Sequence, residues 1–250
     1  ASSTSFTSKS RTPTDRPGDD FTSPLPPRSR FAWCITGSGH YLDESIALAA
    51  RLPSLDLFLS DAAEEVLPIY KMPLDELRPR FAPGFRLVRD KTASAVPVGM
   101  LYDDVYHTVV IAPATSNTVA KCVVGISDTL PTNMFAQAGK LGIPGIVFAC
   151  DTEPVVVTKS PHDWVTLRPR RVELDNVERL REIDFCEVVC SPAELEAALQ
   201  RRLDALEVRV KRALVQQNQV RERAAQPVEL LVVRACPRQR TAVRPHDDAA

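Results

Sequence analysis

The sequence lacks several features that mark whole classes of proteins. No apolar run approaches the roughly 20 residues that a membrane-spanning helix needs, and the first residues contain no apolar stretch of the kind found in secretory signals. An excess of one charge is also missing, because 31 Lys and Arg face 32 Asp and Glu in 250 residues. We therefore expect a soluble cytoplasmic protein that binds neither membranes nor nucleic acid.

The six cysteines do not form a disulfide or metal-binding framework. They are spread from Cys34 to Cys236 through apparent helices and strands. Cys186 and Cys190 are the closest pair, and no second pair completes a zinc or iron–sulfur site. Free cysteine is commonly a small buried apolar residue, so we expect reduced structural thiols and no bound metal.

Composition divides the chain into three parts. Residues 1–30 contain seven Ser, five Thr and five Pro without apolar periodicity, which is typical of a disordered tail. Residues 31–215 carry regularly patterned apolar segments and are expected to form one domain. Residues 216–250 form a C-terminal extension, in which VELLVV at 228–233 is a candidate edge strand.

Within residues 31–215, short apolar segments alternate with helical patterns. Strands are expected at 31–36, 55–60, 108–112 and 145–150, with shorter candidates at 86–90 and 185–190. Strands that are apolar on both faces and alternate with helices belong to parallel sheets that are covered on both sides. The pattern predicts an α/β fold, with a doubly wound (flavodoxin-like or Rossmann-like) parallel sheet and helices on both faces.

Capping residues mark where helices begin. Asp61, with Glu64 three residues later, predicts the start of a helix after the second strand, and Ser191 followed by Pro192 predicts the start of the last helix. An apolar stripe runs along this last helix through Leu195, Leu199, Leu203, Leu206 and Val210. The stripe fits packing against its own domain, and it also fits a contact with another subunit.

A glycine-rich turn, TGSGH at 36–40, follows the first strand. Gly37 and Gly39 match the start of a dinucleotide fingerprint, but Leu42 stands where the third glycine belongs. Small residues at this turn expose backbone N–H groups near a helix N-terminus. Ser38 adds a hydroxyl within the turn, and Ser60 adds another at the end of the second strand, so a single phosphate would fit. A plain glycine turn is the alternative.

The third strand leads into PATSNT, residues 113–118. In a doubly wound sheet, ligands bind beyond the carboxyl ends of the strands. We expect Pro113 to stop the strand, and Ser116 is a candidate cap for the next helix. Capping needs only one hydroxyl, whereas a ribityl chain or a heteroaromatic ring would use the remaining groups of Thr115, Ser116, Asn117 and Thr118. A polar loop that only caps the helix is the alternative.

Two motifs carry a family resemblance. PATSNT resembles the PASANT motif of the homo-oligomeric flavin-containing cysteine decarboxylases, and SDTLPTNMF at 127–135 resembles that family's second motif, a proline followed by an Asn–Met pair. TGSGH also lies where the family binds the FMN phosphate, so the resemblance covers roughly residues 31–200 and implies FMN as cofactor.

The resemblance also implies which residues hold the cofactor. It assigns the phosphate end of FMN to Gly37, Ser38, Gly39 and Ser60, and the ribityl and isoalloxazine end to Thr115, Ser116, Asn117 and Thr118. Asp128 and Asn133 are further candidates for contacts with the ribityl chain or a pterin.

One position departs from the family pattern. The decarboxylases carry a catalytic histidine fourteen residues before the proline of PASANT, and this chain has Gly99 there. His107 lies at the start of its strand, far from the carboxyl end, and cannot replace it. His40 and His162 are candidates for contacts with a ligand, or simply polar residues of a helix start and a loop. The resemblance therefore does not favour decarboxylation.

Four longer segments narrow the resemblance. ITGSGHYLDES, LSDAAEEVLPIY, SDTLPTNMFAQAGK and LRPRRVELDNVERL are similar to the archaeoflavoprotein branch and its bacterial relatives, which include FMN-dependent dihydromethanopterin reductases. This implies an FMN-dependent oxidoreductase that reduces dihydromethanopterin or a similar dihydropterin in one-carbon metabolism. A protein or a small molecule would donate the electrons, and the resemblance implies a trimer-based homo-oligomer. The alternatives are an FMN electron-transfer protein with a ferredoxin-like donor and a phosphopantothenoylcysteine-type decarboxylase. Because the flavin supplies the reactive ring, the sequence nominates no catalytic side chain.

Overall fold

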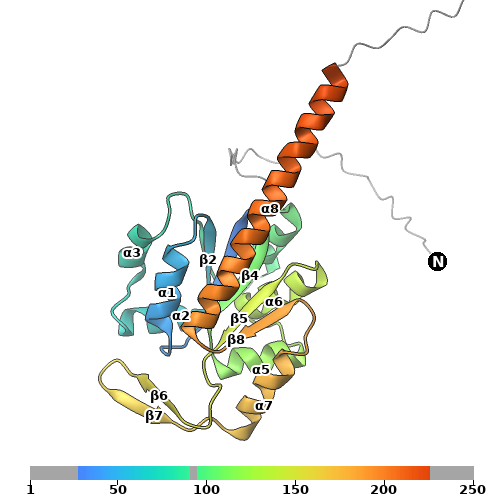
Figure 1. Cartoon of the computed structure of the whole chain (residues 1–250). Helices are drawn as coiled ribbons and strands as arrows, with labels where there is room; N and C mark the ends of the chain where they lie inside the picture. The colour runs from blue at the N-terminus through green and yellow to red at the C-terminus, as the bar shows by residue number, and fades with distance from the viewer. Residues whose placement is uncertain (1–27, 91–94, 226–250) are drawn as a thin grey trace, which may run out of the picture. The chain divides into compact units, whose positions relative to one another are not determined.

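The computed structural model describes residues 28–90 and 95–225 (Figure 1). Most of the expected N-terminal tail and the candidate strand at 228–233 lie outside the described residues. The strands are β1 (Arg30–Ile35), β2 (Leu55–Leu59), β3 (Leu87–Arg89), β4 (Tyr106–Ala114), β5 (Gly145–Ala149), β6 (Val156–Lys159), β7 (Trp164–Leu167) and β8 (Cys186–Val189). The helices are α1 (Leu42–Ala50), α2 (Asp61–Ile69), α3 (Leu74–Leu77), α4 (Ala95–Val98), α5 (Ser116–Val124), α6 (Leu130–Lys140), α7 (Arg171–Leu180) and α8 (Pro192–Ala225), with 3-10 turns η1 (Arg78–Arg80) and η2 (Gly99–Asp103).

Six strands form one parallel sheet in the order β3-β2-β1-β4-β5-β8. Along the chain the order first runs outward from β1 to β3 and then returns to the other side of β1, where β4, β5 and β8 follow. This is the doubly wound arrangement, and the strand order reverses between β1 and β4. The predicted fold class is confirmed.

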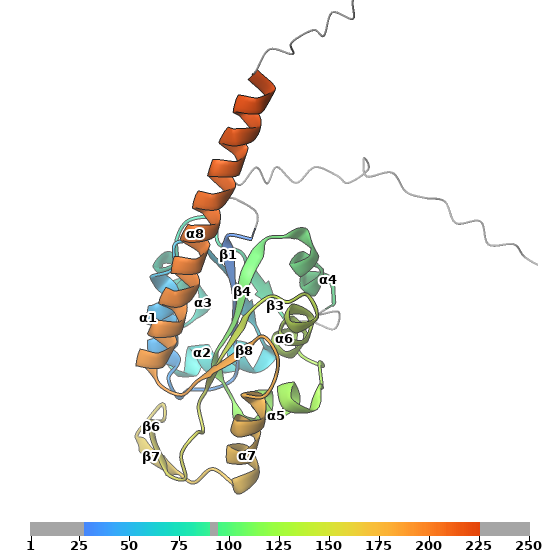
Figure 2. The same cartoon turned by 45° about the vertical axis from the view of Figure 1, so that its right-hand side comes forward.

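The sheet is buried on both faces because alternate side chains of each strand point to opposite sides. Phe31, Trp33 and Ile35 of β1 pack with α1, α2 and the start of α8, while Ala32 and Cys34 face α5, α6 and α7. Figure 2 shows the two helical layers on either side of the sheet. Leu195, Leu199 and Leu203 of α8 belong to the first layer, so this part of the predicted stripe packs against its own domain.

Three local predictions are corrected by the structure. The N-cap of α2 is Ser60 and not Asp61, because the Ser60 hydroxyl accepts a hydrogen bond from the backbone N–H of Ala63 at 3.1 Å. Thr115 rather than Ser116 caps α5, since its hydroxyl accepts from the backbone N–H of Thr118 at 3.1 Å. Pro113 does not end β4, because the strand continues to Ala114, which pairs with Ala149 of β5 after a shift in register.

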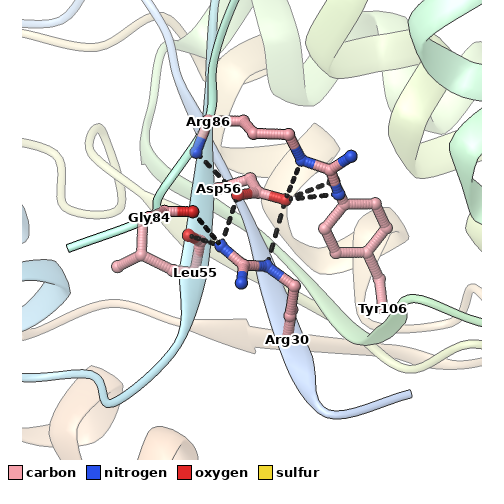
Figure 3. Close-up of polar contacts among 6 residues, drawn as sticks. All are labelled: Arg30, Leu55, Asp56, Gly84, Arg86 and Tyr106. Atoms are coloured by element: carbon pink, nitrogen blue, oxygen red, sulfur yellow. Dashed lines mark hydrogen bonds and ion pairs between the residues drawn. The ribbon is translucent and has the colours of Figure 1, made fainter. Parts of the chain in front are cut away.

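A buried ionic cluster joins the amino-terminal ends of three strands (Figure 3). The Asp56 carboxylate of β2 is fully buried and accepts hydrogen bonds from Arg30 at 2.6 Å, from the Tyr106 hydroxyl at 2.7 Å and from the backbone N–H of Arg86 at 2.8 Å. Arg30 also donates to the carbonyl oxygens of Leu55 and Gly84. A buried carboxylate is tolerated only when it is paired and bonded in this way.

The chain divides into two compact units, residues 1–207 and 208–250, and the division falls inside α8. The predicted boundary between residues 215 and 216 also falls inside this helix. The first unit contains the sheet and its helical layers. Among residues 28–90 and 95–225, no helix combines the length and the apolar character that crossing a membrane requires.

Candidate functional site

The carboxyl ends of β1 and β4 lie side by side at the point where the strand order reverses. Thr36, the residue after β1, joins them: its hydroxyl donates to the carbonyl oxygen of Pro113 at 2.7 Å and accepts from the backbone N–H of Thr115 at 3.1 Å. TGSGH and PATSNT are 77 residues apart in sequence and are thereby held together at the edge where doubly wound sheets bind ligands.

A cavity of about 660 Å³ opens at this edge. It is large enough for a nucleotide-sized cofactor, since ligand pockets usually measure about 300–1,000 Å³. The N-terminal ends of α2, α5 and α6 all reach its wall. Hydroxyl and amide groups dominate the lining, from Thr36, Ser60, Thr115, Asn117, Thr118 and Thr129.

The helix N-termini favour an anion in this cavity. Each carries partial positive charge on backbone N–H groups that the helix itself does not use. Gly37 brings the backbone close to α2: a Cβ atom built at this position would lie 2.7 Å from the Cβ of Ala62. Any larger residue at position 37 would therefore push the first turn of α2 out of place.

Four charged side chains also line the cavity: Asp61, Asp90, Asp128 and Lys121. Asp90, at the end of β3, accepts a hydrogen bond from the backbone N–H of Leu130 at 2.7 Å and so fixes the start of α6. Lys121 of α5 donates to both carboxylate oxygens of Asp128, at 2.8 and 2.9 Å. This bond from Lys121 holds the pKa of Asp128 below its ordinary value.

The predicted site residues fall into four groups. Gly37, Ser60, Thr115, Asn117, Thr118 and Asp128 line the 660 Å³ cavity together. Ser38 and Gly39 line a smaller cavity of about 230 Å³ on the other side of the glycine turn, and Ser116 lines a third of about 450 Å³ beside α7. Asn133 of α6 lines none of these three cavities, and its role stays a prediction.

The 230 Å³ cavity lies between the glycine turn and the hairpin formed by β6 and β7. His40 and Asp151 line it, and the Tyr70 hydroxyl ties the hairpin to α2 by donating to the carbonyl oxygen of Lys159 at 3.3 Å. Asp151 also accepts a hydrogen bond from the Ser116 hydroxyl. Thr115 lines all three cavities, and Asp151 lines the two smaller ones.

His40 is held in a definite orientation beside this cavity. Its ring stacks on Tyr41 with 3.8 Å between ring centroids, and Nδ1 is buried without a hydrogen-bond partner in the described part of the chain. Burial lowers the pKa of the imidazole, and the carboxylates of Asp151 and Glu44 oppose only part of this shift. His40 thus presents a largely neutral imidazole to the 230 Å³ cavity.

Cys150, at the end of β5, stays a thiol. Burial raises its pKa to about 12, and its sulfur accepts a hydrogen bond from the Ser38 hydroxyl at 3.3 Å. The thiolate is the reactive form of cysteine, so a protonated and buried sulfur is inert. Cys150 supports the glycine turn and is not a nucleophile.

A further cavity, of about 550 Å³, lies away from the carboxyl edge. Its walls come from α5, α6 and the connection between α7 and β8, and they include Gly145 at the start of β5 and Phe185 just before β8. Apolar groups dominate this lining, and few polar groups converge in it. The hydroxyl-rich cavity at the switch point is the better candidate for binding a polar cofactor.

Thr36, Asp90 and Lys121 belong to the site and were not predicted from the sequence. Thr36 stands directly before the first glycine of TGSGH, and Asp90 is the last residue of the short segment RLVRD, at 86–90, that was a strand candidate. The rule that ligands lie beyond the carboxyl ends of strands would have selected both. Lys121 carries no comparable signal, because its position depends on how α5 packs beside α6.

Comparison with known proteins defines the family. A family model described as Flavoprotein matches residues 25–210, and the chain belongs to this family. An uncharacterized protein of Methanocaldococcus jannaschii is 35% identical over 183 residues, which are 70% of this chain and 96% of that protein. A dihydromethanopterin reductase (acceptor) of Methanosarcina mazei is 33% identical over 176 residues, which are 66% of this chain and 66% of the reductase. The chain thus spans about two thirds of the length of that reductase.

A solved structure is more similar still. DmrB of Burkholderia xenovorans, described in complex with FMN as a cubic protein cage for redox transfer, is 67% identical, with a TM-score of 0.67. The match covers 73% of this chain and 99% of the DmrB chain. An FMN-bound UbiX protein, AnUbiX, is only 16% identical at a TM-score of 0.50, and it supports the fold alone.

Proposed function

We propose that this protein is an FMN-dependent oxidoreductase that reduces dihydromethanopterin, or a similar dihydropterin, to the tetrahydro form. The observation that carries the proposal is the hydroxyl-rich cavity at the switch point, in a chain that is 67% identical to DmrB with bound FMN. The curated relative named as a dihydromethanopterin reductase supports the substrate. The match to that reductase covers 66% of each chain, so the substrate is tested directly.

The residues of the cavity fit FMN. The N-terminus of α2, with Ser60 and the backbone of Gly37, is suited to a phosphate, because it offers N–H groups and partial positive charge. Thr115, Thr118 and Asn117 offer hydroxyl and amide groups to the ribityl chain and the ring edge. Asn117 is exposed and makes no hydrogen bond within residues 28–90 and 95–225, so its amide is available to a ligand.

The cofactor, when bound, supplies hydride transfer to the pterin, and the protein supplies position and local field. Thr36 holds the two binding loops at a fixed separation, and Asp90 fixes the start of α6. The neutral imidazole of His40 and the carboxylate of Asp151 lie one cavity away and are placed to orient polar groups of the substrate. These roles involve binding and orientation, so no single acid or base is required.

Decarboxylation is not supported. The position of the family's catalytic histidine is Gly99, in η2, and a Cβ atom at this glycine would meet nothing within 4 Å. The backbone would accept a side chain there, yet the sequence has none, so this position contributes no proton-transfer group.

The substrate is tested in a half-reaction. The bound FMN is reduced anaerobically, dihydromethanopterin is added, and reoxidation is followed through the recovery of flavin absorbance. We expect rapid reoxidation with formation of the tetrahydro product by chromatography. A flavin that stays reduced with the pterin and is reoxidised only by an electron-acceptor protein would contradict the reductase and indicate an electron carrier. Folic acid in its fully oxidised form serves as a control for nonspecific reoxidation.

A further inference from the structure

The cavity of about 450 Å³ beside α7, here called the α7 cavity, takes its walls from the start of α5, from Asp151 after β5 and from α7. Its volume is in the range of sites for small organic molecules, about 300–1,000 Å³. Thr115 and Asn117 line both this cavity and the 660 Å³ cavity, so the two lie side by side. All of the lining residues belong to the first compact unit, which therefore contains both cavities.

Asp151 presents a carboxylate to the α7 cavity. The residue is half-buried, and within residues 28–90 and 95–225 its carboxylate accepts one hydrogen bond, from the Ser116 hydroxyl, and forms no ion pair. A carboxylate has two oxygens with about four acceptor positions. The bond from Ser116 orients the group and leaves most of these positions for a ligand that donates N–H groups.

The other carboxylates in the walls of the three cavities are used differently. Asp61 is exposed and lies in the first turn of α2, where its charge offsets the positive end of the helix. The remaining three accept hydrogen bonds from the protein: Asp90 from the backbone N–H of Leu130, Asp128 from Lys121 and Glu173 from Arg170. Asp151 is thus the half-buried carboxylate that no cation and no backbone N–H engages within the described chain.

Asn176 of α7 is a second group that points to a ligand. It lines the α7 cavity, is only 8% exposed, and its side chain makes no hydrogen bond within the part of the chain that the structure describes. A buried amide without a partner costs stability, and such groups usually find a partner in water or a ligand. Ala120 and Val172 line the same cavity and offer apolar surface to the face of a ring.

A carboxylate and an amide together match one kind of ring edge. The pterin ring carries a 2-amino-4-oxopyrimidine edge, in which the 2-amino group and N3–H are neighbouring donors and O4 beside them is an acceptor. The two oxygens of a carboxylate accept from two neighbouring N–H groups at once, and hydrogen bonds to an ionised group are the stronger ones. The amide of an asparagine can donate to the adjacent carbonyl oxygen.

We propose that the α7 cavity binds the pterin ring, with Asp151 accepting from N3–H and the 2-amino group and Asn176 donating to O4. The inference rests on the proposed function, because it gives the dihydropterin a place beside the cavity assigned to FMN. It adds the two side chains that select the pterin ring. Guanine carries the same edge on a narrower ring system, so the test includes it.

The experiment measures binding without electron transfer. The full-length protein with oxidised FMN is titrated by calorimetry with 6-methylpterin and with 6-methyllumazine, which has a carbonyl oxygen in place of the 2-amino group. In the lumazine, this oxygen would face the carboxylate of Asp151 and lose a hydrogen bond. A site built around a hydrogen bond strongly rejects an analogue that lacks it, so we expect the wild type to prefer the pterin by about 100-fold.

The Asp151→Asn variant should lose this preference. Asparagine keeps an oxygen for the Ser116 hydroxyl, but its N–H2 group would meet the donors of the pterin. We expect the affinity for 6-methylpterin to fall about 30-fold and the preference over 6-methyllumazine to shrink to about threefold. FMN content should match that of the wild type, because Asp151 does not line the 660 Å³ cavity.

Two further variants separate recognition from general damage. Asn176→Ala removes the donor to O4, which both ligands carry, so it should weaken both by about fivefold and keep the preference. Glu153→Gln is the matched control for Asp151→Asn: it removes one negative charge two residues away, on an exposed side chain that lines none of the three cavities. Its affinities should equal those of the wild type.

Three results would overturn the proposal: equal affinity of the wild type for the two ligands, an undiminished preference in Asp151→Asn, or guanosine that binds more tightly than 6-methylpterin. The third would assign the cavity to a purine. A wild type that shows the preference, but whose reduced flavin is not reoxidised by dihydromethanopterin, would count only against the proposed function. Reoxidation by dihydromethanopterin together with an undiminished preference in Asp151→Asn would count only against this site.

Discussion

The two ends of the sheet differ in how their polar groups are used. At the amino ends, the carboxylate of Asp56 is surrounded by donors from Arg30, Arg86 and Tyr106, and the cluster is closed. At the carboxyl ends, the hydroxyls of Thr36 and Thr115 accept hydrogen bonds from the backbone of PATSNT and so fix its conformation. The side chain of Asn117 and Nδ1 of His40 have no partner within the described chain. The first end is built for stability, and the second leaves groups free for a ligand.

The comparison shows why buried polar residues need to be sorted by their partners. Both ends contain carboxylates, hydroxyls and nitrogen donors. A satisfied cluster stabilises the fold and rejects ligands, because any new partner would have to displace an existing bond. A buried group without a partner costs stability, and a ligand that bonds to it recovers that cost, whereas an exposed group such as the Asn117 amide bonds to water until a ligand replaces it. Substitutions at the two ends should therefore affect different measurements.

The largest effect is expected from Asp56→Ala. Removing the carboxylate leaves Arg30 and the Tyr106 hydroxyl buried without their partner, which should lower the free energy of unfolding by about 3 kcal/mol or more. Denaturation by urea measures the loss. The matched control is Asp128→Ala, which removes a carboxylate from the exposed pair with Lys121 and should leave the unfolding midpoint nearly unchanged. Similar losses in the two variants would show that the amino-end cluster is not special.

The next effect is expected from Gly37→Ala. The added methyl group would lie 2.7 Å from the Cβ of Ala62 and 3.4 Å from its backbone, so the first turn of α2 has to shift, at a cost of about 1–3 kcal/mol. We expect weaker FMN retention by equilibrium dialysis. In the control Gly139→Ala, within α6, the methyl group meets nothing within 4 Å and should be neutral or stabilising. FMN retention that is the same in both variants would argue against the glycine turn as the phosphate site.

A smaller effect is expected from Asn117→Ala. The exposed amide makes no bond in the described chain, so the free energy of unfolding should not change, whereas FMN affinity should fall about tenfold because a ligand atom loses its partner. Affinity is measured by the quenching of flavin fluorescence in a titration. A loss of stability with unchanged affinity would place Asn117 with the structural residues.

The smallest effect is expected from pH near neutrality. Burial tends to raise the pKa of Asp56, but the hydrogen bonds from Arg30, Tyr106 and the backbone of Arg86 outweigh it, and the pKa lies below its ordinary value. The stabilisation is then fully present above the unfolded-state pKa of Asp, about 3.9, and is lost as the pH falls through the lower folded-state pKa. Unfolding midpoints should not depend on Asp56 between pH 6 and 8, and Asp56→Asn should reduce the acid sensitivity. A change in the Asp56→Asn difference between pH 6 and 8 would contradict this assignment.

Much of the fold was predictable because apolar segments and capping residues mark strands and helices over a few consecutive residues. Apolar segments gave the strands at 31–36, 55–60 and 145–150 to within one residue, and the helix expected after PATSNT is α5. The predictions that failed were at element ends, where two neighbouring residues were both suitable caps. Ser60 and Thr115 took these positions because their backbones are extended just before the helix, which the sequence does not reveal.

The sequence by itself determined the fold class, the two polar loops at strand ends and the motifs that they share with flavoproteins, because each depends on residues that are close along the chain. Only the tertiary structure decided which loops meet. Thr36 reaches Pro113 over 77 residues, Asp90 reaches Leu130 over 40, and Arg30 reaches Asp56 over 26. Such contacts follow from strand order and helix packing, which bring distant residues together in ways that no local pattern encodes.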